Sequence, residues 1–228
     1  MLYGYAGVVL HGTLMTLALA LLAVLGATAL GISGALCRTS GSKLLRVVAL
    51  GYTTLIRSVP DLVIMLLIFY NLQILLNGLC ELIGIQRIEL DAFTAGVITV
   101  SFIYGAYMTE TFRGALEEIP GGQVEAALSV GMTSSQVFRK VTLPQVIRYA
   151  LPGYSNNIQV IIKATALVSI IGLVDIITVT QQAGQATQHA FFFNLLAAAI
   201  YLALTSVVMW FLFRLNRHAN RGVKRAAL

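Results

Sequence analysis

The sequence predicts an all-α, polytopic membrane protein with five transmembrane helices in a single domain covering residues 1–228. Three observations indicate this fold class. Of the 228 residues, 58% are hydrophobic and only 11% are charged, whereas a soluble domain carries about 25% charged residues. The apolar residues form long stretches without charge, and most basic residues lie between these stretches. Membrane topology therefore explains the net charge of +6 better than nucleic-acid binding does.

The charge-free stretches predict helices rather than strands. A helix that crosses a hydrocarbon core needs about 20 residues and satisfies its own backbone groups. The alternating segments of a membrane barrel are not found. The first stretch lacks a basic start and is too long for a signal peptide, so we interpret it as a retained membrane helix. The stretches lie between Met1 and Cys37, Leu62 and Cys80, Ala92 and Thr109, and Ile176 and Phe213.

Five spans follow in order from these stretches. Pro60 suits the first turn of the second span, because a missing N–H costs nothing there. The fourth span is the least apolar, since Lys163 and Asp175 enclose only a short uncharged segment. Without that span, however, the basic carboxyl-terminal tail would face outward. The predicted spans cover approximately residues 8–36, 62–83, 92–112, 155–174 and 191–213.

Basic residues predict the orientation of the chain. Cytoplasmic connections of membrane proteins carry an excess of Lys and Arg. The first connection, the long middle connection and the tail hold four, four and five of the 15 basic residues. We therefore expect a periplasmic amino terminus and a cytoplasmic carboxyl terminus. The basic residues concerned are Arg38, Lys43, Arg46 and Arg57; Arg113, Arg139, Lys140 and Arg148; and Arg214, Arg217, Arg221, Lys224 and Arg225.

The middle connection predicts a helix–turn–helix on the cytoplasmic face. Residues 123–130 suit a short helix, and Gly131 follows at a position where helices commonly end in a left-handed residue. Thr133 and Gln136 have the spacing of a capping box, which predicts that a second helix begins there. Pro144 is expected to stop or kink that helix. An alternative is an amphipathic hairpin that only covers the helix ends.

Several ionisable residues in or near the spans are candidates for a gate or a translocation path. Glu110 and Arg113 are three residues apart and can pair on one helix face. Arg57 is expected at the cytoplasmic interface, and Lys163 is expected to be an interfacial or interhelical partner. Asp175 is expected at the outer end of the fourth span. We favour structural or gating roles over substrate binding, although carboxylates inside membranes are functional candidates by default.

Small residues in the spans are expected to allow close helix packing. They are Gly96, Gly105, Ala106, Ala164 and Gly172.

Catalytic and metal-binding functions have little support in the sequence. His11, His189 and His218 are scattered and form no ligand cluster with Cys37 or Cys80, so no metal site is expected. The chain contains no Gly-Lys dipeptide and therefore no P-loop lysine for ATP phosphates. No nucleophile–base constellation indicates an intramembrane enzyme.

Four motifs resemble those of importer-type ABC permeases of the polar amino-acid family. The family's EAA loop is matched by Glu125, Ala126, Ala127, Gly131, Val141, Leu143 and Pro144. Arg57-Ser58-Val59-Pro60 is similar to an Arg-Gly-Thr-Pro motif, from which its two middle residues depart. The other two matches are Ala106-Tyr107-Met108-Thr109-Glu110 with Arg113-Gly114, and the run from Lys163 through Thr165 and Leu167 to Ser169.

This resemblance implies the ABC type I importer permease fold, with a coupling loop over about residues 120–148. In such proteins the loop docks into a cytoplasmic ATPase, so Glu125, Ala126, Ala127, Gly131, Leu143 and Pro144 are expected to mark the ATPase contact. The expected partners are a homologous permease subunit in a heterodimer, two ATPase copies, a periplasmic amino-acid-binding protein and the lipid bilayer. ATP and Mg²⁺ would bind to the ATPase, and the permease itself would hold no cofactor.

The substrate expectation comes from finer similarities. The runs 1–4, 51–57 and 222–226 are similar to permease subunits that import histidine, lysine, arginine and ornithine. We therefore expect a non-catalytic subunit of the bacterial inner membrane that moves cationic amino acids by alternating access. A permease for another polar amino acid or an opine is the alternative. A stand-alone secondary transporter is less favoured, because no internal repeat is found.

Overall fold

The computed structural model describes residues 4–87 and 89–220, and these residues form helices without a strand. Met1, Arg221, Lys224, Arg225 and the run 222–226, which contributed to the expectations above, lie outside the described residues. The elements in chain order are α1 (Ala6–Thr39), α2 (Lys43–Ser58), α3 (Asp61–Ile83), α4 (Ala92–Glu117), α5 (Gly121–Ser129), α6 (Ser134–Val137), the π-helix η2 (Phe138–Thr142), α7 (Leu143–Val168), the 3₁₀ turn η3 (Ser169–Ile171), α8 (Ile176–Thr187) and α9 (Ala190–Ala219).

Five membrane crossings agree with the lengths and hydropathy of the helices. Helices α1, α3, α4 and α9 are each long and apolar enough to cross a membrane. The fifth candidate consists of two parts, Ser134–Ile171 and Ile176–Thr187, which meet at an angle of 57°. The predicted fourth span, residues 155–174, falls within this bent pair. The all-helical fold class with four or five candidate crossings is therefore confirmed, and the predicted fourth span corresponds to a bent pair that is either a broken span or a re-entrant loop.

The bend between α7 and α8 has a local cause. Gly172 has a φ of 95°, a left-handed conformation that ends η3. Asp175 then caps α8, because its carboxylate accepts a hydrogen bond of 2.9 Å from the Thr178 N–H. A Cβ on Gly172 would meet no atom within 4 Å. The expectation that Gly172 permits close packing is thus wrong, and its role is conformational.

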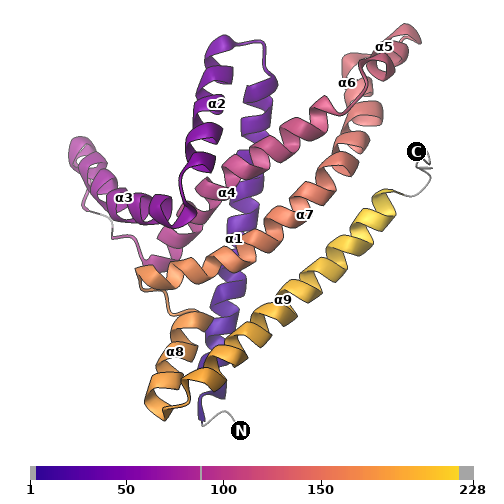
Figure 1. The fold of residues 1–228 in the computed structure, drawn as a ribbon. Helices are drawn as coiled ribbons and strands as arrows, with labels where there is room; N and C mark the ends of the chain where they lie inside the picture. Colours follow the sequence, from indigo (N-terminus) through magenta and orange to yellow (C-terminus); the bar gives the residue numbers. More distant parts are fainter. Residues whose placement is uncertain (1–3, 88, 221–228) are drawn as a thin grey trace.

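Helices α1 and α4 form the centre of the fold and lie side by side over most of their lengths (Figure 1). Their approach depends on glycine. A Cβ on Gly26 would lie 2.3 Å from the Ser101 hydroxyl, and one on Gly31 would lie 2.5 Å from the Met108 Cβ. Gly105 faces Leu30 and Tyr52 in the same way, as expected from the sequence.

Helix α2 was not predicted, since its residues were assigned to a cytoplasmic loop. Its 16 residues form an amphipathic helix that turns back from the end of α1 and packs against α1 and α4 (Figure 1). At 1.5 Å per residue, α2 is about 24 Å long. Arg57, in its last turn, is therefore far from the α1–α2 turn. That Arg57 lies at the cytoplasmic interface stays a prediction.

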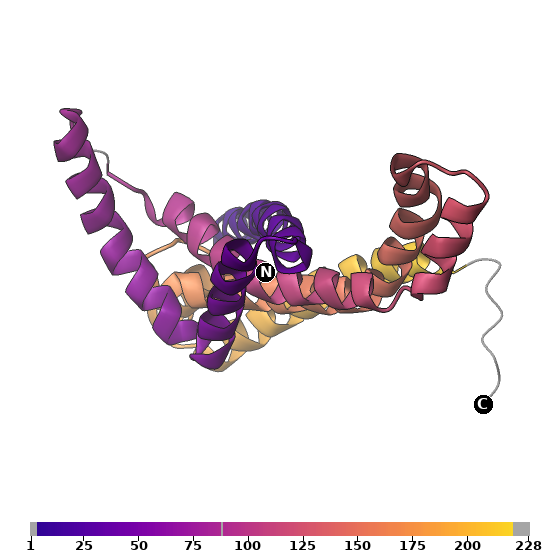
Figure 2. The same ribbon diagram turned by 90° about the horizontal axis from the view of Figure 1, so that it is seen from above.

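Two helices expose most of their apolar surface in the single chain. Only 11% of the most apolar window of α3, and of that of α9, is buried. Viewed from above, α3 extends away from the other helices on one side, while α5 and α6 project on the other (Figure 2). Because a lone chain cannot hide these faces from water, they require lipid or other protein around them.

The basic connections gather at one end of the molecule. The α1–α2 turn, α5 and α6 lie at the top of Figure 1 and the end of α9 lies in its upper half, whereas the first turns of α1 and helix α8 lie at the bottom. This arrangement agrees with the distribution of Lys and Arg along the sequence, Arg57 excepted.

Candidate functional site

The hairpin of α5, α6 and η2 (residues 121–142), called the α5–α6 hairpin below, projects from the helix bundle (Figure 2). Its predicted local structure is confirmed. Gly131 has a φ of 83° and ends α5 in the left-handed region. The Thr133 hydroxyl accepts a hydrogen bond from the Gln136 N–H, and the Gln136 side chain accepts one from the Thr133 N–H. This capping box starts α6.

Pro144 neither stops the second helix nor leaves it an ordinary α-helix. Residues Phe138–Thr142 form a π-helix, and the chain continues directly into α7 with Pro144 in its first turn. A π-turn widens the helix and changes the hydrogen-bond pattern next to the proline, which has no N–H to donate. The hairpin is thereby joined to α7 without an intervening loop.

The hairpin has a buried seam and an exposed apolar outer surface. Ala127 on α5 and Val137 on α6 are both buried. Val130 at the turn is 79% exposed, and Leu128 and Phe138 are also exposed. Such a surface on a projecting element is typical of a protein-binding site. Glu125, Ala126 and Gly131 are exposed as well, and so are Leu143 and Pro144 at the start of α7.

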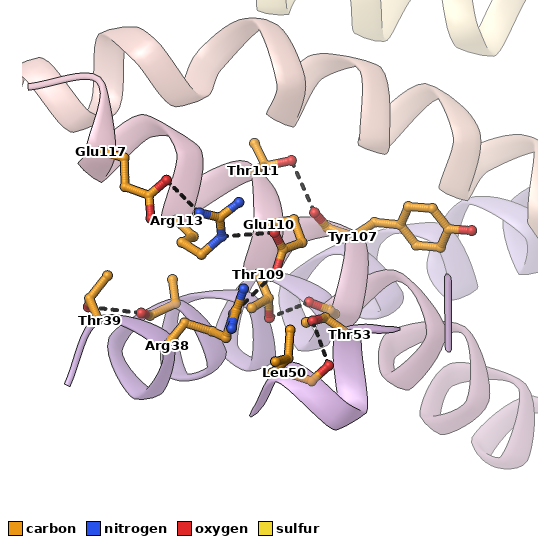
Figure 3. Close-up of polar contacts among 12 residues, drawn as sticks. Arg38, Thr39, Leu50, Thr53, Tyr107, Thr109, Glu110, Thr111, Arg113 and Glu117 are labelled. Atoms are coloured by element: carbon orange, nitrogen blue, oxygen red, sulfur yellow. Dashed lines mark hydrogen bonds and ion pairs between the residues drawn. The ribbon is translucent and has the colours of Figure 1, made fainter. Parts of the chain in front are cut away.

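Below the hairpin, an ion-pair network joins α1 to α4 (Figure 3). Glu110 receives the Arg113 Nε at 2.8 Å and lies 3.5 Å from the Arg38 Nε. Arg113 also binds Glu117 through its Nη1. The predicted Glu110–Arg113 pair is therefore confirmed, and Arg38 is a partner that sequence spacing did not reveal. The side chains of Arg38 and Glu110 are each only 16% exposed, so this pair is screened less than a surface pair.

A second polar group joins the α2–α3 corner to α4. The Asp61 carboxylate accepts hydrogen bonds from the hydroxyls of Tyr104, at 2.8 Å, and Tyr107, at 3.3 Å. The guanidinium of Arg57 lies over the ring of Tyr107, 5.5 Å from its centre. Tyr107 thus touches both the cation and the anion that flank Ser58-Val59-Pro60. The segment 57–61 is held on α4 by side chains rather than by backbone pairing.

One polar cavity of about 360 Å³ lies between these two groups. Its lining includes Arg38, Thr53, Arg57, Tyr107 and Glu110, from α1, α2 and α4. Two guanidinium groups and one carboxylate therefore face a shared polar space. Rearrangement of these pairs is one way in which three helices can exchange partners without exposing an unpaired charge to lipid.

Lys163 and Asp175 are not part of this constellation. Lys163 is exposed on α7, five residues before that helix ends. Asp175 is fully buried at the bend before α8 and packs against the first turns of α1, where a Cβ on Gly12 would lie 2.9 Å from its carbonyl oxygen. Its carboxylate Oδ2 has no hydrogen-bond partner among the described residues.

The structure thus brings Arg57, Glu110 and Arg113 to one region and leaves Lys163 and Asp175 outside it. Sequence reasoning did not foresee Arg38 as the partner of Glu110, and it did not single out Thr53 or Asp61. The signal for Asp61 was its place immediately after Pro60, in the first turn of a membrane helix. Within the described ranges, no group of three His, Cys, Asp or Glu residues could hold a metal ion.

Comparison with known proteins identifies the family. A family model described as "Binding-protein-dependent transport system inner membrane component" matches residues 27–222. The chain belongs to this family. Together with the apolar helices, membership makes the chain a multi-pass inner membrane transport component.

Individual relatives of this inner membrane component are similar over nearly their full lengths. The histidine/lysine/arginine/ornithine transport system permease protein HisQ of Escherichia coli strain K12 is 51% identical, with 100% of both chains covered. The octopine transport system permease protein OccQ of Rhizobium radiobacter is 35% identical over 97% of this chain and 94% of its own. A crystal structure of an amino acid ABC transporter with histidines matches with a TM-score of 0.79 and 34% identity, covering 94% and 95% of the two chains.

Proposed function

We propose that this inner membrane component is the permease subunit of an ABC importer for the cationic amino acids histidine, lysine, arginine and ornithine. The observation that carries the substrate class is the 51% identity with a permease of that specificity over all 228 residues. An opine permease is the second candidate, supported by the 35% identity with the octopine protein. The amino acids are favoured because the chain is more similar to the histidine/lysine/arginine/ornithine permease than to the octopine permease.

ATP hydrolysis is assigned to a partner chain, because this chain has no Gly-Lys dipeptide to contact nucleotide phosphates. ATP and Mg²⁺ accordingly belong to two copies of a cytoplasmic ATPase. A homologous permease subunit would cover part of the exposed helix surface in a heterodimer, the lipid bilayer would cover the rest, and a periplasmic binding protein would deliver the substrate. In this arrangement the chain is a translocation subunit and not an enzyme.

The α5–α6 hairpin is the proposed contact with the ATPase. Its exposed apolar turn supports this role, and so does its attachment to the bundle. Helix α4 ends three residues before Pro120, and η2 runs directly into α7. Helices α4 and α7 are tied together by the Asn157 amide, which donates to the Thr111 hydroxyl at 3.0 Å. Movement of the hairpin would therefore be transmitted to two packed core helices at once.

The network of Arg38, Glu110 and Arg113 is the proposed gate element. It lies on the part of α4 nearest the hairpin and holds α1 against α4. Because partly buried ion pairs have discrete partners, a small shift of α4 would change which residues pair. Arg57 next to Tyr107 extends this element toward the α2–α3 corner. Lys163 and Asp175 are assigned to helix positioning on the opposite half of the path.

The proposed orientation places the amino terminus in the periplasm and the α5–α6 hairpin, the α1–α2 turn and the end of α9 in the cytoplasm. The collection of basic connections at one end supports it. A reporter enzyme fused after Leu228 tests it. Activity of a cytoplasm-dependent reporter is expected, and activity of a periplasm-dependent reporter would overturn the orientation.

Reconstitution tests the transport function and the substrate together. The chain is placed in proteoliposomes with its partner permease and ATPase, ATP is enclosed, and labelled arginine is supplied with the binding protein. Uptake is expected to require ATP and to be reduced by excess lysine, ornithine or histidine. Competition by octopine alone would support the second candidate. Uptake by the chain without the ATPase, driven by an ion gradient, would instead indicate a secondary transporter.

A further inference from the structure

A groove of about 630 Å³ lies on the last turns of α9, and none of its lining residues belongs to the α5–α6 hairpin or to the ion-pair network. It is lined by Trp210, Phe213, Arg214, Arg217 and His218, and we call it the Trp210–His218 groove. None of these residues has a part in the proposed transport function. All five are exposed in the chain.

The spacing of these residues places them on one face of α9. Phe213, Arg214, Arg217 and His218 lie three, four, seven and eight residues after Trp210, and residues at these spacings share a face in an α-helix. The guanidinium of Arg214 lies over the indole of Trp210, 4.2 Å from its centre. This stacking holds the Arg214 cation beside the aromatic surface.

The groove has two chemically different halves along the helix axis. Trp210 and Phe213 are 57% and 65% exposed and make its inner half apolar. Arg217 and His218 make the outer half basic and lie in the last turn of the helix. A molecule that fills the whole groove therefore has an apolar part next to a negative group.

Among residues 4–87 and 89–220, no carboxylate forms an ion pair with the arginines of the groove. The sequence contains no Asp or Glu from residue 176 to its end at residue 228. The neighbouring Arg148 adds a further cation, since its Nε donates to the Ala219 carbonyl at 3.3 Å. The groove is thus a site of unneutralised positive charge at a helix end.

The length of α9 places this groove at the membrane surface. Its 30 residues extend over about 45 Å, and a tilt of about 20° still leaves about 42 Å along the membrane normal. The hydrocarbon core is only about 30 Å thick. The last turns of α9 therefore extend into the headgroup region, with Trp210 near the boundary where tryptophan is enriched in membrane proteins.

We propose that the Trp210–His218 groove binds an anionic phospholipid, with the lipid phosphate between Arg214 and Arg217 and the upper acyl chain against Trp210 and Phe213. Arginine forks match phosphate geometry, and the two halves of the groove match the two parts of the lipid. The assignment to the cytoplasmic leaflet rests on the proposed orientation, but binding itself does not depend on transport.

Trp210 provides a direct probe, because it is the only tryptophan of the chain. The full-length chain is placed in nanodiscs of phosphatidylcholine that contain increasing fractions of brominated phosphatidylglycerol or brominated phosphatidylcholine, and quenching of Trp210 fluorescence is measured. Each arginine near an anionic surface changes the binding constant about fivefold. The mole fraction of brominated lipid that halves the Trp210 fluorescence is therefore expected to be at least about fivefold lower for phosphatidylglycerol than for phosphatidylcholine.

Variants separate this site from general attraction of the basic protein to the membrane. The double variant Arg214→Gln/Arg217→Gln is expected to lose the preference, by up to about 25-fold for two arginines. The matched control Arg139→Gln/Lys140→Gln removes the same charge from η2 and is expected to keep it. Arg217→Lys, which retains charge on a folded chain, is expected to keep most of it. Circular dichroism checks that each variant is folded.

Three results would overturn the proposal. Equal quenching by the two brominated lipids shows no headgroup preference. Loss of the preference in the control double variant shows that net charge alone attracts the lipid. Displacement of the lipid by millimolar inorganic phosphate or by the partner ATPase shows that the groove is an anion site or a protein interface instead. None of these results bears on ATP-driven uptake, so this test and the transport test fail independently.

Discussion

Replacing Gly31 by alanine tests whether the close approach of α1 and α4 depends on a missing side chain. Gly31 is buried on α1. A Cβ at this position would lie 2.5 Å from the Met108 Cβ and 3.1 Å from the Met108 carbonyl carbon. Neither atom belongs to the flexible end of a side chain, so relief requires movement of the helix itself. Inserting a methyl group into such a packed contact typically costs about 1–3 kcal/mol.

A matched variant isolates this packing cost. Gly51→Ala also replaces a glycine within a helix, but a Cβ on Gly51 would meet no atom within 4 Å. Both substitutions gain about 1 kcal/mol from helix propensity. Subtracting one from the other therefore leaves the steric term of about 1–3 kcal/mol, which corresponds to a separation in Tm of about 2–12 °C for a chain of this size.

The assay is thermal unfolding of the purified chain in one detergent, followed by circular dichroism. Gly31→Ala is expected to unfold at the lower temperature and Gly51→Ala at or above that of the unmodified chain. Gly26→Ala provides an intermediate case, because the nearest atom there is the Ser101 hydroxyl, which can rotate away. Equal Tm values for Gly31→Ala and Gly51→Ala would refute the argument that glycine sets the α1–α4 distance.

Three further predictions concern the α5–α6 hairpin and the network beneath it. Gly131→Val is expected to reduce ATP-driven uptake, because a non-glycine residue at this positive φ costs about 1–2 kcal/mol. Gly131→Asn is expected to retain more uptake, because asparagine tolerates that backbone conformation. Higher uptake in Gly131→Val than in Gly131→Asn would contradict a backbone role. Glu110→Gln is expected to destabilise the chain by about 1.5–3 kcal/mol. Glu117→Gln, which removes a 60% exposed partner of Arg113, is expected to cost less than about 1 kcal/mol. Similar losses of Tm in the two variants would show that the partly buried Glu110 is not the more stabilising partner. Thr133→Ala removes a helix cap worth about 1 kcal/mol, so hydrogen exchange should accelerate in the hairpin and not in α1, whereas unchanged exchange would show that the cap is dispensable.

The sequence predicted the spans well because membrane helices obey a simple length rule. Residues 62–83 and 92–112 nearly coincide with α3 and the first part of α4. The capping box at Thr133 and the left-handed Gly131 were also predicted, since each depends on residues within one or two turns. The Glu110–Arg113 pair belongs to the same class, because three residues on a helix always share a face.

The prediction of a loop between the first two spans failed for an equally physical reason. Helix α2 carries Lys43, Arg46 and Arg57, and these charges mask a 16-residue amphipathic helix in a search for long apolar runs. Its apolar face is buried only because α1 and α4 supply a surface for it. Helix α8 was missed similarly, because its glutamine-rich sequence resembles a polar connection between spans. Its packing against α1 and α9 is visible only in the tertiary structure.

The sequence by itself therefore determined the fold class, most of the spans and the local form of the hairpin, because these depend on hydrophobic length and short-range hydrogen bonds. Only the tertiary structure decided which distant side chains meet. Asp61 binds Tyr104 and Tyr107 across more than 40 residues of sequence, and Arg38 reaches Glu110 across 72 positions. The Asp61 contacts exist because α2 and α3 return to α4, and the Arg38–Glu110 contact exists because α1 packs along α4. Both depend on the packing of helices that are distant in the sequence.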